Sequence, residues 1–191
     1  MGDMDFETTA HPSIRRARPC FAFLLASVLA VSTAASAQEA PVQAEQKRTS
    51  FVVELVRDPT TYVPAGLLYT SMRLDWNSSQ PFFQNGFVEE NARYTLSGLP
   101  KDHPLSYSQG NSQILKDSLA VLPASFANNA LAHMVERKLT DKFPQHRKLW
   151  KTLSWIERVS FATFASNRLA GPHLEQWKKN ERLAREYGFV P

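Results

Sequence analysis

Three polar side chains of the chain carry the chemistry of a metal or acid–base site. Asp75 and Glu90 supply carboxylates and His133 supplies an imidazole, which together can bind a divalent metal ion or transfer protons. Asn167 is a fourth candidate, because it falls on the apolar stripe predicted for its helix. If the fold brings these side chains together, they form a candidate catalytic cluster.

The same side chains also have a structural interpretation. A buried polar group without a hydrogen-bond partner costs about 1–3 kcal/mol, so inward-facing Asp, Asn and His side chains commonly bond to helix ends or loop backbone. Asp75 falls near the end of a predicted helix, where it can accept hydrogen bonds from the hydroxyls of Ser78 and Ser79 or from the backbone amides that follow. We therefore favour a structural polar network over a metal or catalytic cluster.

Longer motifs of known chemistry do not occur in the sequence. There is no Gly-x-Ser-x-Gly, His-Glu-x-x-His, Gly-x-Gly-x-x-Gly or Walker loop. His103, His133, His146 and His173 are isolated instead of being paired at the spacing of metal ligands. The sequence therefore predicts no cofactor.

The N-terminal part of the chain has the pattern of a secretory signal peptide. Arg15, Arg16 and Arg18 precede an apolar run over residues 21–31, and Ala35-Ser36-Ala37 then supplies an A-x-A cleavage site before Gln38. We expect residues 1–37 to be the signal peptide, 38–50 a flexible polar tether and 51–191 one helical domain. Whether the leader is cleaved or kept as an anchor stays open.

Cysteine content and charge indicate the compartment and the partners of the exported domain. Cys20, the only cysteine, lies in the leader, so the mature chain forms no disulfide, which favours a bacterial envelope or periplasmic protein. From Arg137 onward the chain has twelve Lys or Arg against five Asp or Glu. No dense basic block occurs, so we predict no nucleic-acid partner. Lys148, Lys151, Lys178 and Lys179 are candidates for contact with an envelope protein or an anionic membrane surface.

Apolar periodicity predicts an all-α domain, a small irregular bundle of three to four helices. The expected helices cover residues 64–77, 108–139, 146–170 and 173–187. Pro81 and Gly171-Pro172 are expected to end helices, Pro123 to kink the second one, and a long connection to join the first two. Residues 51–56 are expected to be extended, because they are apolar and β-prone. Gly188 is expected to cap the last helix, with Phe189 folding back on it.

The same periodicity predicts which side of the third helix is buried. Leu149, Leu153, Ile156, Thr163 and Asn167 share one stripe, which we expect to face the core. Lys151, Ser154 and Arg158 lie away from this stripe and are expected to face solvent.

A membrane-spanning alternative arises from residues 118–135, which carry no formal charge. Pro123, Asn128, Asn129 and His133 within this stretch are costly to expose to lipid. A bundle that is soluble or bound at a membrane surface is therefore favoured.

One resemblance rests on short motifs. Asp75 with Ser78-Ser79, then Gly86 with Glu89-Glu90-Asn91, then His133 and Asn167 on two later helices follow one another in the chain. This order resembles small uncharacterised bacterial helical envelope proteins, in which an Asp with hydroxyl residues precedes a Glu-x-Asn-Pro-like connection. The likeness covers residues 67–170, and Ala92 stands where the proline would fall. It implies a helical fold and no activity, because that group has no established one.

The sequence therefore predicts an exported envelope protein that acts as a structural or interaction module, with the membrane surface as one place of contact. Two alternatives stay open: a metal-dependent or hydrolytic enzyme centred on Asp75, Glu90 and His133, and a membrane-embedded helical protein.

Overall fold

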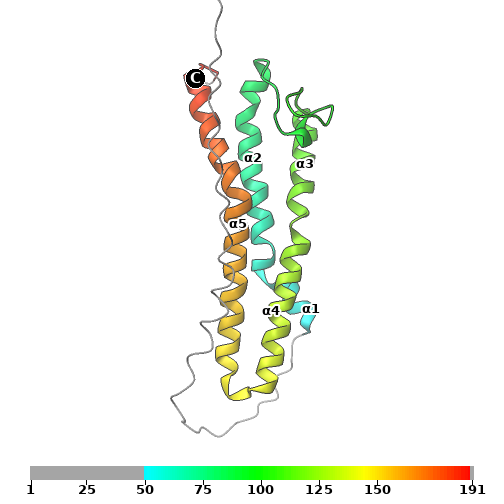
Figure 1. Cartoon of the computed structure of the whole chain (residues 1–191), viewed down its shortest axis with the longest axis vertical. Coiled ribbons are helices and arrows are strands. Elements are labelled where there is room, and N and C mark those ends of the chain that lie inside the picture. Colours follow the sequence, from blue (N-terminus) through cyan, green and yellow to red (C-terminus); the bar gives the residue numbers. More distant parts are fainter. Residues whose placement is uncertain (1–49, 190–191) are drawn as a thin grey trace, which may run out of the picture. The chain divides into compact units, whose positions relative to one another are not determined.

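The computed structural model describes residues 50–189 and confirms an all-α domain. The predicted leader and nearly all of the tether lie outside the described residues. Within residues 50–189 there is no strand, and the elements are α1 (Phe51–Arg57), η2 (Pro59–Thr61), α2 (Val63–Gln84), η3 (Ala92–Tyr94), α3 (Tyr107–Leu119), α4 (Leu122–Lys142), η4 (Pro144–His146) and α5 (Arg147–Glu186) (Figure 1).

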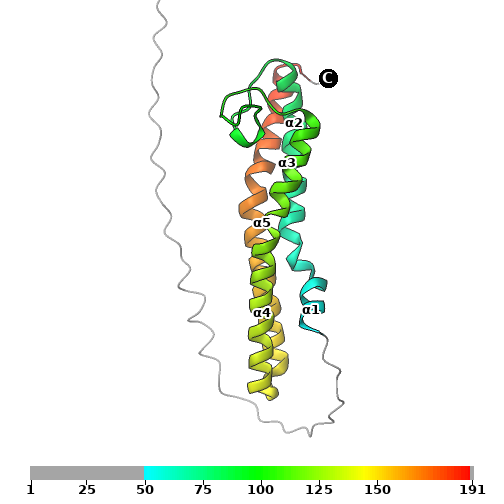
Figure 2. The ribbon, with the colours of Figure 1, turned by 90° about the vertical axis from the view of Figure 1, so that its right-hand side faces the viewer.

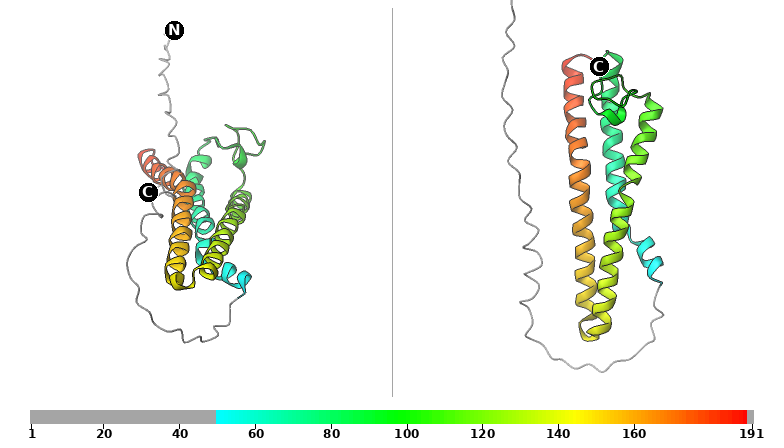
Figure 3. Two further views of the ribbon diagram at one scale, coloured as in Figure 1. Left: turned by 60° about the horizontal axis from the view of Figure 1, so that its bottom comes forward. Right: turned by 45° about the vertical axis from the view of Figure 1, so that its right-hand side comes forward.

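Helices α3 and α4 follow one another along one side of the bundle and run opposite to α5 and α2 (Figures 2 and 3). Helix α2 packs against the second half of α5 and against α3, while α4 packs against the first half of α5. Helices α2 and α5 run in the same direction, since Phe82 near the end of α2 meets Phe189 just beyond α5, with ring centroids 5.5 Å apart.

The segment expected to be extended is a short helix, so that prediction is wrong. Helix α1 covers Phe51–Arg57 and buries none of its residues. The helical cost of its β-branched residues is below about 0.7 kcal/mol each, and the part of the chain that the structure describes holds no strand for them to pair with. An ion pair between Glu54 and Arg137, at 2.8 Å, joins α1 to α4, so tertiary contacts select the helix.

Two predicted helix ends do not occur, because both prolines lie inside longer helices. Pro81 lies within α2 and Pro172 within the 40-residue α5. A proline inside a helix costs about 3 kcal/mol, and the packing of the following turns offsets that cost. Beyond Pro81, Phe82 packs on Phe189. Beyond Pro172, His173 and Asn180 bond to side chains of α2.

The predicted second helix is two helices, which break at Ala120 and Val121. Pro123 stands in the first turn of α4, where its missing N–H leaves no intrahelical bond unmade. The expected kink at Pro123 is therefore a helix start. The predicted cap at the other end of the bundle is present: Gly188 has φ +71° and the amide of Phe189 donates to the carbonyl of Ala184 at 2.8 Å.

The apolar core lies where the 85–106 connection covers α2 and α3. Leu68, Met72 and Trp76 of α2 pack with Tyr94 of η3 and Ile114 of α3. Gly110 lets α3 approach Trp76 closely, because a Cβ at this position would lie 2.3 Å from the indole carbons Cε2 and Cζ2. The connection is held by two antiparallel bridges, Glu89 to Asp102 and Thr95 to Pro104.

Helix α5 buries the side opposite to the predicted one. Its buried face is made of residues four apart: Ser154, Arg158, Ala162, Ser166 and Ala170. Most of the predicted core stripe lies outside: Leu149 and Ile156 are 49% and 47% exposed, Thr163 and Asn167 are also exposed, and Leu153 is half-buried. Four of these side chains are small, and Arg158 is buried among them because its charge is paired with Asp58 and Glu136. Apolarity alone therefore does not decide which face of α5 is inside.

Candidate functional site

A cavity of about 230 Å³ lies between α2, α5, α3 and the 85–106 connection. Its apolar wall is the core cluster around Trp76 and Tyr94. Polar side chains line the remaining wall: Asp75, Ser79, Glu89, Glu90, Asn91, His173 and Gln176. Two of the four residues predicted from the sequence, Asp75 and Glu90, therefore lie in one site.

Asp75 is fixed by residues of α5. Its Oδ2 lies 2.9 Å from Nδ1 of His173, and its Oδ1 accepts from Nδ2 of Asn180 at 3.4 Å. Asn180 also donates to the hydroxyls of Ser78 and Ser79. Those hydroxyls donate to the backbone carbonyl of Asp75 and not to its carboxylate as expected. The carboxylate is thereby left for His173, which it orients.

Glu89 is a second carboxyl group that lines this cavity, and its pKa is raised. Burial raises its pKa, and the nearby charges of Asp75 and Glu90 act in the same direction, although the backbone amide of Asn91 donates to Oε1 at 2.8 Å. Glu90 itself is exposed at the rim. An imidazole oriented by a carboxylate, beside a carboxyl that keeps its proton to higher pH, is an arrangement able to exchange protons.

Replacing Glu89 by Gln should stabilise the domain at neutral pH. A raised pKa in the folded state means that stability is present at low pH and is lost as pH rises and Glu89 ionises. The Gln side chain keeps the acceptor for Asn91 and removes the charge. We expect a higher midpoint of urea unfolding than wild type at pH 7 and no difference at pH values where Glu89 is protonated in both states. Glu175→Gln, at an exposed glutamate of α5, controls for the loss of one charge. A lower midpoint for Glu89→Gln at pH 7 would contradict this account of the cavity.

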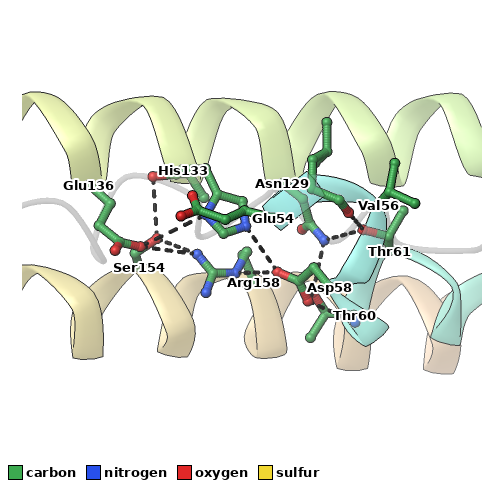
Figure 4. A network of polar contacts seen from close by, with 12 residues as sticks. Glu54, Val56, Asp58, Thr60, Thr61, Asn129, His133, Glu136, Ser154 and Arg158 are labelled. Carbon is green, nitrogen blue, oxygen red and sulfur yellow. Dashed lines mark hydrogen bonds and ion pairs between the residues drawn. The ribbon is translucent and has the colours of Figure 1, made fainter. Parts of the chain in front are cut away.

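His133 is not part of the cavity but belongs to a buried polar network that joins η2, α4 and α5 (Figure 4). Its Nε2 lies 3.2 Å from Oδ2 of Asp58, and its Nδ1 lies 4.0 Å from Oε2 of Glu136. Arg158 of α5 reaches both carboxylates, with Nε 2.7 Å from Asp58 and Nη1 3.5 Å from Glu136. Both ring nitrogens of His133 are thus directed at carboxylates inside a charge network.

Hydroxyl and amide groups complete the same network. Asn129, which is fully buried, donates through Nδ2 to the hydroxyls of Thr60 and Thr61 at 2.8 Å each. Thr60 donates its amide and its hydroxyl to Oδ1 of Asp58, at 3.0 and 2.6 Å. Ser154 accepts from Arg158 and donates to the carbonyl of Ala132. Every charge of the network is therefore bonded, which matches the structural interpretation of His133.

The environment of Asp58 favours its ionised form. Burial alone would raise its pKa, but the two hydrogen bonds from Thr60, the charge of Arg158 and the bond from His133 outweigh burial, and the pKa is lowered. Asp58 is thus a charged anchor for α1 and η2 on the α4–α5 pair. Asp58 was not among the residues predicted from the sequence. The local signal that could have indicated it is the Asp58-Pro59 pair, which is typical of a helix start, but this signal does not specify partners on α4 and α5.

The remaining predicted residues lie apart from the cavity. Asn167 is exposed on α5, so its expected inward position is wrong. Lys148 and Lys151 begin α5, whereas Lys178 and Lys179 lie near its end, about 45 Å away at 1.5 Å per residue. These lysines therefore form two separate pairs. His173, whose Nδ1 contacts Asp75, was not predicted as a site residue. The last helix was expected to begin at His173, so this residue was not expected to lie inside a helix packed against Asp75.

The described residues contain neither a metal-binding cluster nor a helix suited to cross a membrane. Among residues 50–189, no group of three or more His, Cys, Asp or Glu side chains could hold a metal ion. Over the same residues, no helix combines the length and the apolarity that a membrane crossing requires.

Comparison of the chain with protein-family models, with curated proteins and with solved structures gave no match.

Proposed function

We propose that the chain is an exported, non-enzymatic interaction module of the bacterial envelope, which binds a helical partner through the outer face of α5. The proposal takes the domain as an irregular bundle of three to four helices with a long connection over residues 85–106. The leader pattern of residues 1–37 supports export. The outward position of the apolar stripe of α5 is the observation that carries the binding role.

Ser160 lies between Ile156 and Thr163 on the same side of α5 and is exposed. We call the stripe with Ser160 added the α5 seam: Leu149, Leu153, Ile156, Ser160, Thr163 and Asn167. Leu149 and Ile156 are exposed on this side of α5 and Leu153 is half-buried, while Trp155 and Phe164 beside them are 57% and 58% exposed. Contiguous exposed apolar patches mark protein or membrane contact sites. The seam therefore supports a binding role, because only a partner molecule could remove its apolar side chains from water.

A second exposed apolar surface lies on α4, the helix that pairs with the first half of α5. Leu131, Met134 and Val135 are exposed there, while the side of α4 that faces α5 buries Ser125, Asn129, Ala132 and His133. The small and polar inner faces hold the two helices together, and their larger apolar side chains point outward. This distribution supports a module whose bulkiest apolar groups serve contact and not the internal core.

Pull-down from the envelope tests this function. The full chain, crosslinked in cells, should capture an envelope component, and the double variant Leu149→Glu/Ile156→Glu should lose it. Lys178→Gln/Lys179→Gln, far from the seam, is the matched surface control and should capture normally. Equal capture by the seam variant and wild type would overturn the seam as the contact site. Recovery of the chain only in the cytoplasmic fraction would overturn export.

The four lysines supply a separate test for the membrane surface. Lys148 and Lys151 lie at the end of α5 that carries the apolar part of the seam, so neutralising them should weaken binding to anionic vesicles, whereas neutralising Lys178 and Lys179 should change it less. If neutralising the first pair and neutralising the second pair both leave vesicle binding unchanged, lysine-mediated membrane contact is excluded.

The cavity supports a second candidate function, acid–base catalysis in which His173 takes the place expected for His133. Its support is the 2.9 Å contact between Asp75 and His173 beside Glu89. Turnover of ester, phosphate-ester or amide test substrates that is lost in Asp75→Asn would favour this function. Equal turnover by wild type and Asp75→Asn would exclude it.

A further inference from the structure

We propose that the partner of the α5 seam is a second copy of this chain, bound as a parallel, in-register two-stranded coil over residues 149–167. This inference rests on the proposed function, because it uses the same seam, and it goes further by naming the occupant and its direction.

The spacing of the seam is that of a coiled coil. Its six positions are separated by four, three, four, three and four residues, a period of 3.5 that keeps one stripe facing a partner helix. All six belong to the single helix α5, over a length of about 27 Å at 1.5 Å per residue. None of the six is charged, so two copies can meet without burying a charge. A seam with this period is complementary to a second helix of the same kind.

The order of residues along the seam selects a parallel, in-register pair. Leu149, Leu153 and Ile156 occupy one end, and Ser160, Thr163 and Asn167 occupy the other. In a parallel pair each apolar residue meets its own copy, and Asn167 meets Asn167, a pairing known to fix register in two-stranded coils. In an antiparallel pair Asn167 would lie against Leu149, which would bury an amide against an apolar side chain.

The flanking positions agree with that direction. In a parallel coil, the residue that precedes every second seam position, here Leu153 and Ser160, faces the residue five positions later in the other helix. Val159 then meets Phe164 of the second copy, which adds an apolar contact on each side. Thr152 meets Glu157, so the charged flanking residue is not placed opposite a like charge. On the opposite side of α5, Ser154, Arg158 and Ala162 stay packed inside their own domain, so pairing needs no change in the fold.

Site-specific disulfide formation tests this arrangement, because the chain has one cysteine, in the leader. In the full chain carrying Cys20→Ser, the variant Ser160→Cys places two thiols opposite each other at the seam. With copper–phenanthroline and oxygen as the oxidant, the two thiols lose two electrons and two protons and form an intermolecular disulfide. We expect a covalent dimer of twice the 21.6 kDa of the chain. Lys151→Cys, exposed on the same helix but off the seam, should stay monomeric, and adding Leu149→Glu/Ile156→Glu to Ser160→Cys should abolish the crosslink.

The possible outcomes separate the self-pairing from the broader function. No crosslink for Ser160→Cys, together with a monomer mass by light scattering at every concentration, overturns the second copy as occupant. In that case seam-dependent capture of a different envelope protein would leave the proposed function standing, and seam-independent capture would remove both. Efficient crosslinking between Leu149→Cys and Asn167→Cys, without any for Ser160→Cys, would overturn the parallel direction. If Lys151→Cys crosslinks as strongly as Ser160→Cys, the disulfides form by random collision, and the seam is not the contact between two copies.

Discussion

Replacing Asp58 by Ala is expected to lower the free energy of unfolding by about 3–5 kcal/mol, the cost of removing one partner from a buried ion pair. Arg158 and His133 would lose the carboxylate that lies 2.7 and 3.2 Å from them, and both groups are buried. Thr60 would also lose the acceptor of its amide and hydroxyl. Urea unfolding followed by circular dichroism measures the loss.

The matched control is an ion pair on the surface of the same bundle. Glu186→Ala removes the partner of Arg182, 3.8 Å away and with both side chains more than half exposed, and should cost less than about 0.5 kcal/mol because exposed pairs contribute little. A similar small loss for Asp58→Ala would mean that the network does not anchor α1 and η2.

The same network sets the response of the domain to acid. Since the pKa of Asp58 is lowered in the folded state, its contribution is present above its ordinary pKa and is lost as pH falls through the lowered one. The difference in stability between wild type and Asp58→Ala should therefore shrink in strong acid. A difference that grows as pH falls would contradict the assignment.

Replacing Gly110 by Ala is expected to destabilise the domain by about 1–3 kcal/mol, the usual cost of overpacking a core. The new methyl group would stand 2.3 Å from two carbons of the Trp76 ring. This ring is held in place by Phe83 and Tyr94, at centroid distances of 5.4 and 5.6 Å, so α3 or the ring must move. Thermal unfolding followed by circular dichroism measures the loss of stability.

Gly66 provides a control of opposite sign for the same substitution. It lies within α2, and a Cβ there would have open space, so Gly66→Ala should stabilise the domain by roughly 0.5–1 kcal/mol through the lower entropy cost of fixing Ala in a helix. If Gly110→Ala and Gly66→Ala shift the unfolding midpoint in the same direction, the close contact between α3 and Trp76 is not as described.

Fold class could be predicted from the sequence, whereas helix ends and faces could not. Apolar spacing at three and four residues is a local signal, and it is enough to predict an all-α domain. Pro81 and Pro172 were wrongly expected to end helices. The free-energy cost of a proline in a helix is local, and it is offset by contacts between residues far apart in the chain, such as Phe82 with Phe189. Residue type also misled on α5, where close helix packing placed Ala and Ser inside.

The sequence predicted two residues of the candidate site, Asp75 and Glu90, but not His173. Asp75 and Glu90 lie near each other in sequence and meet across one connection, so their common position follows from local structure. His173 comes from α5, 98 residues beyond Asp75 in the chain, and only the parallel packing of α2 and α5 brings it there. The partners of His133 likewise come from two other elements, η2 and α5, whose packing no local pattern specified.

The central claim is that the apolar seam of α5 lies outside and its small-residue face lies inside. Two glutamate substitutions on this helix, Ile156→Glu and Ala162→Glu, test it by urea unfolding at protein concentrations low enough to keep the chain monomeric. We predict that Ile156→Glu changes the free energy of unfolding by no more than about 0.5 kcal/mol, because the side chain is about half exposed. Ala162→Glu should lower it by at least about 3 kcal/mol, because a bulky charge would enter a position that is 4% exposed. The reverse order, with Ile156→Glu unfolding the domain and Ala162→Glu tolerated, would contradict the account.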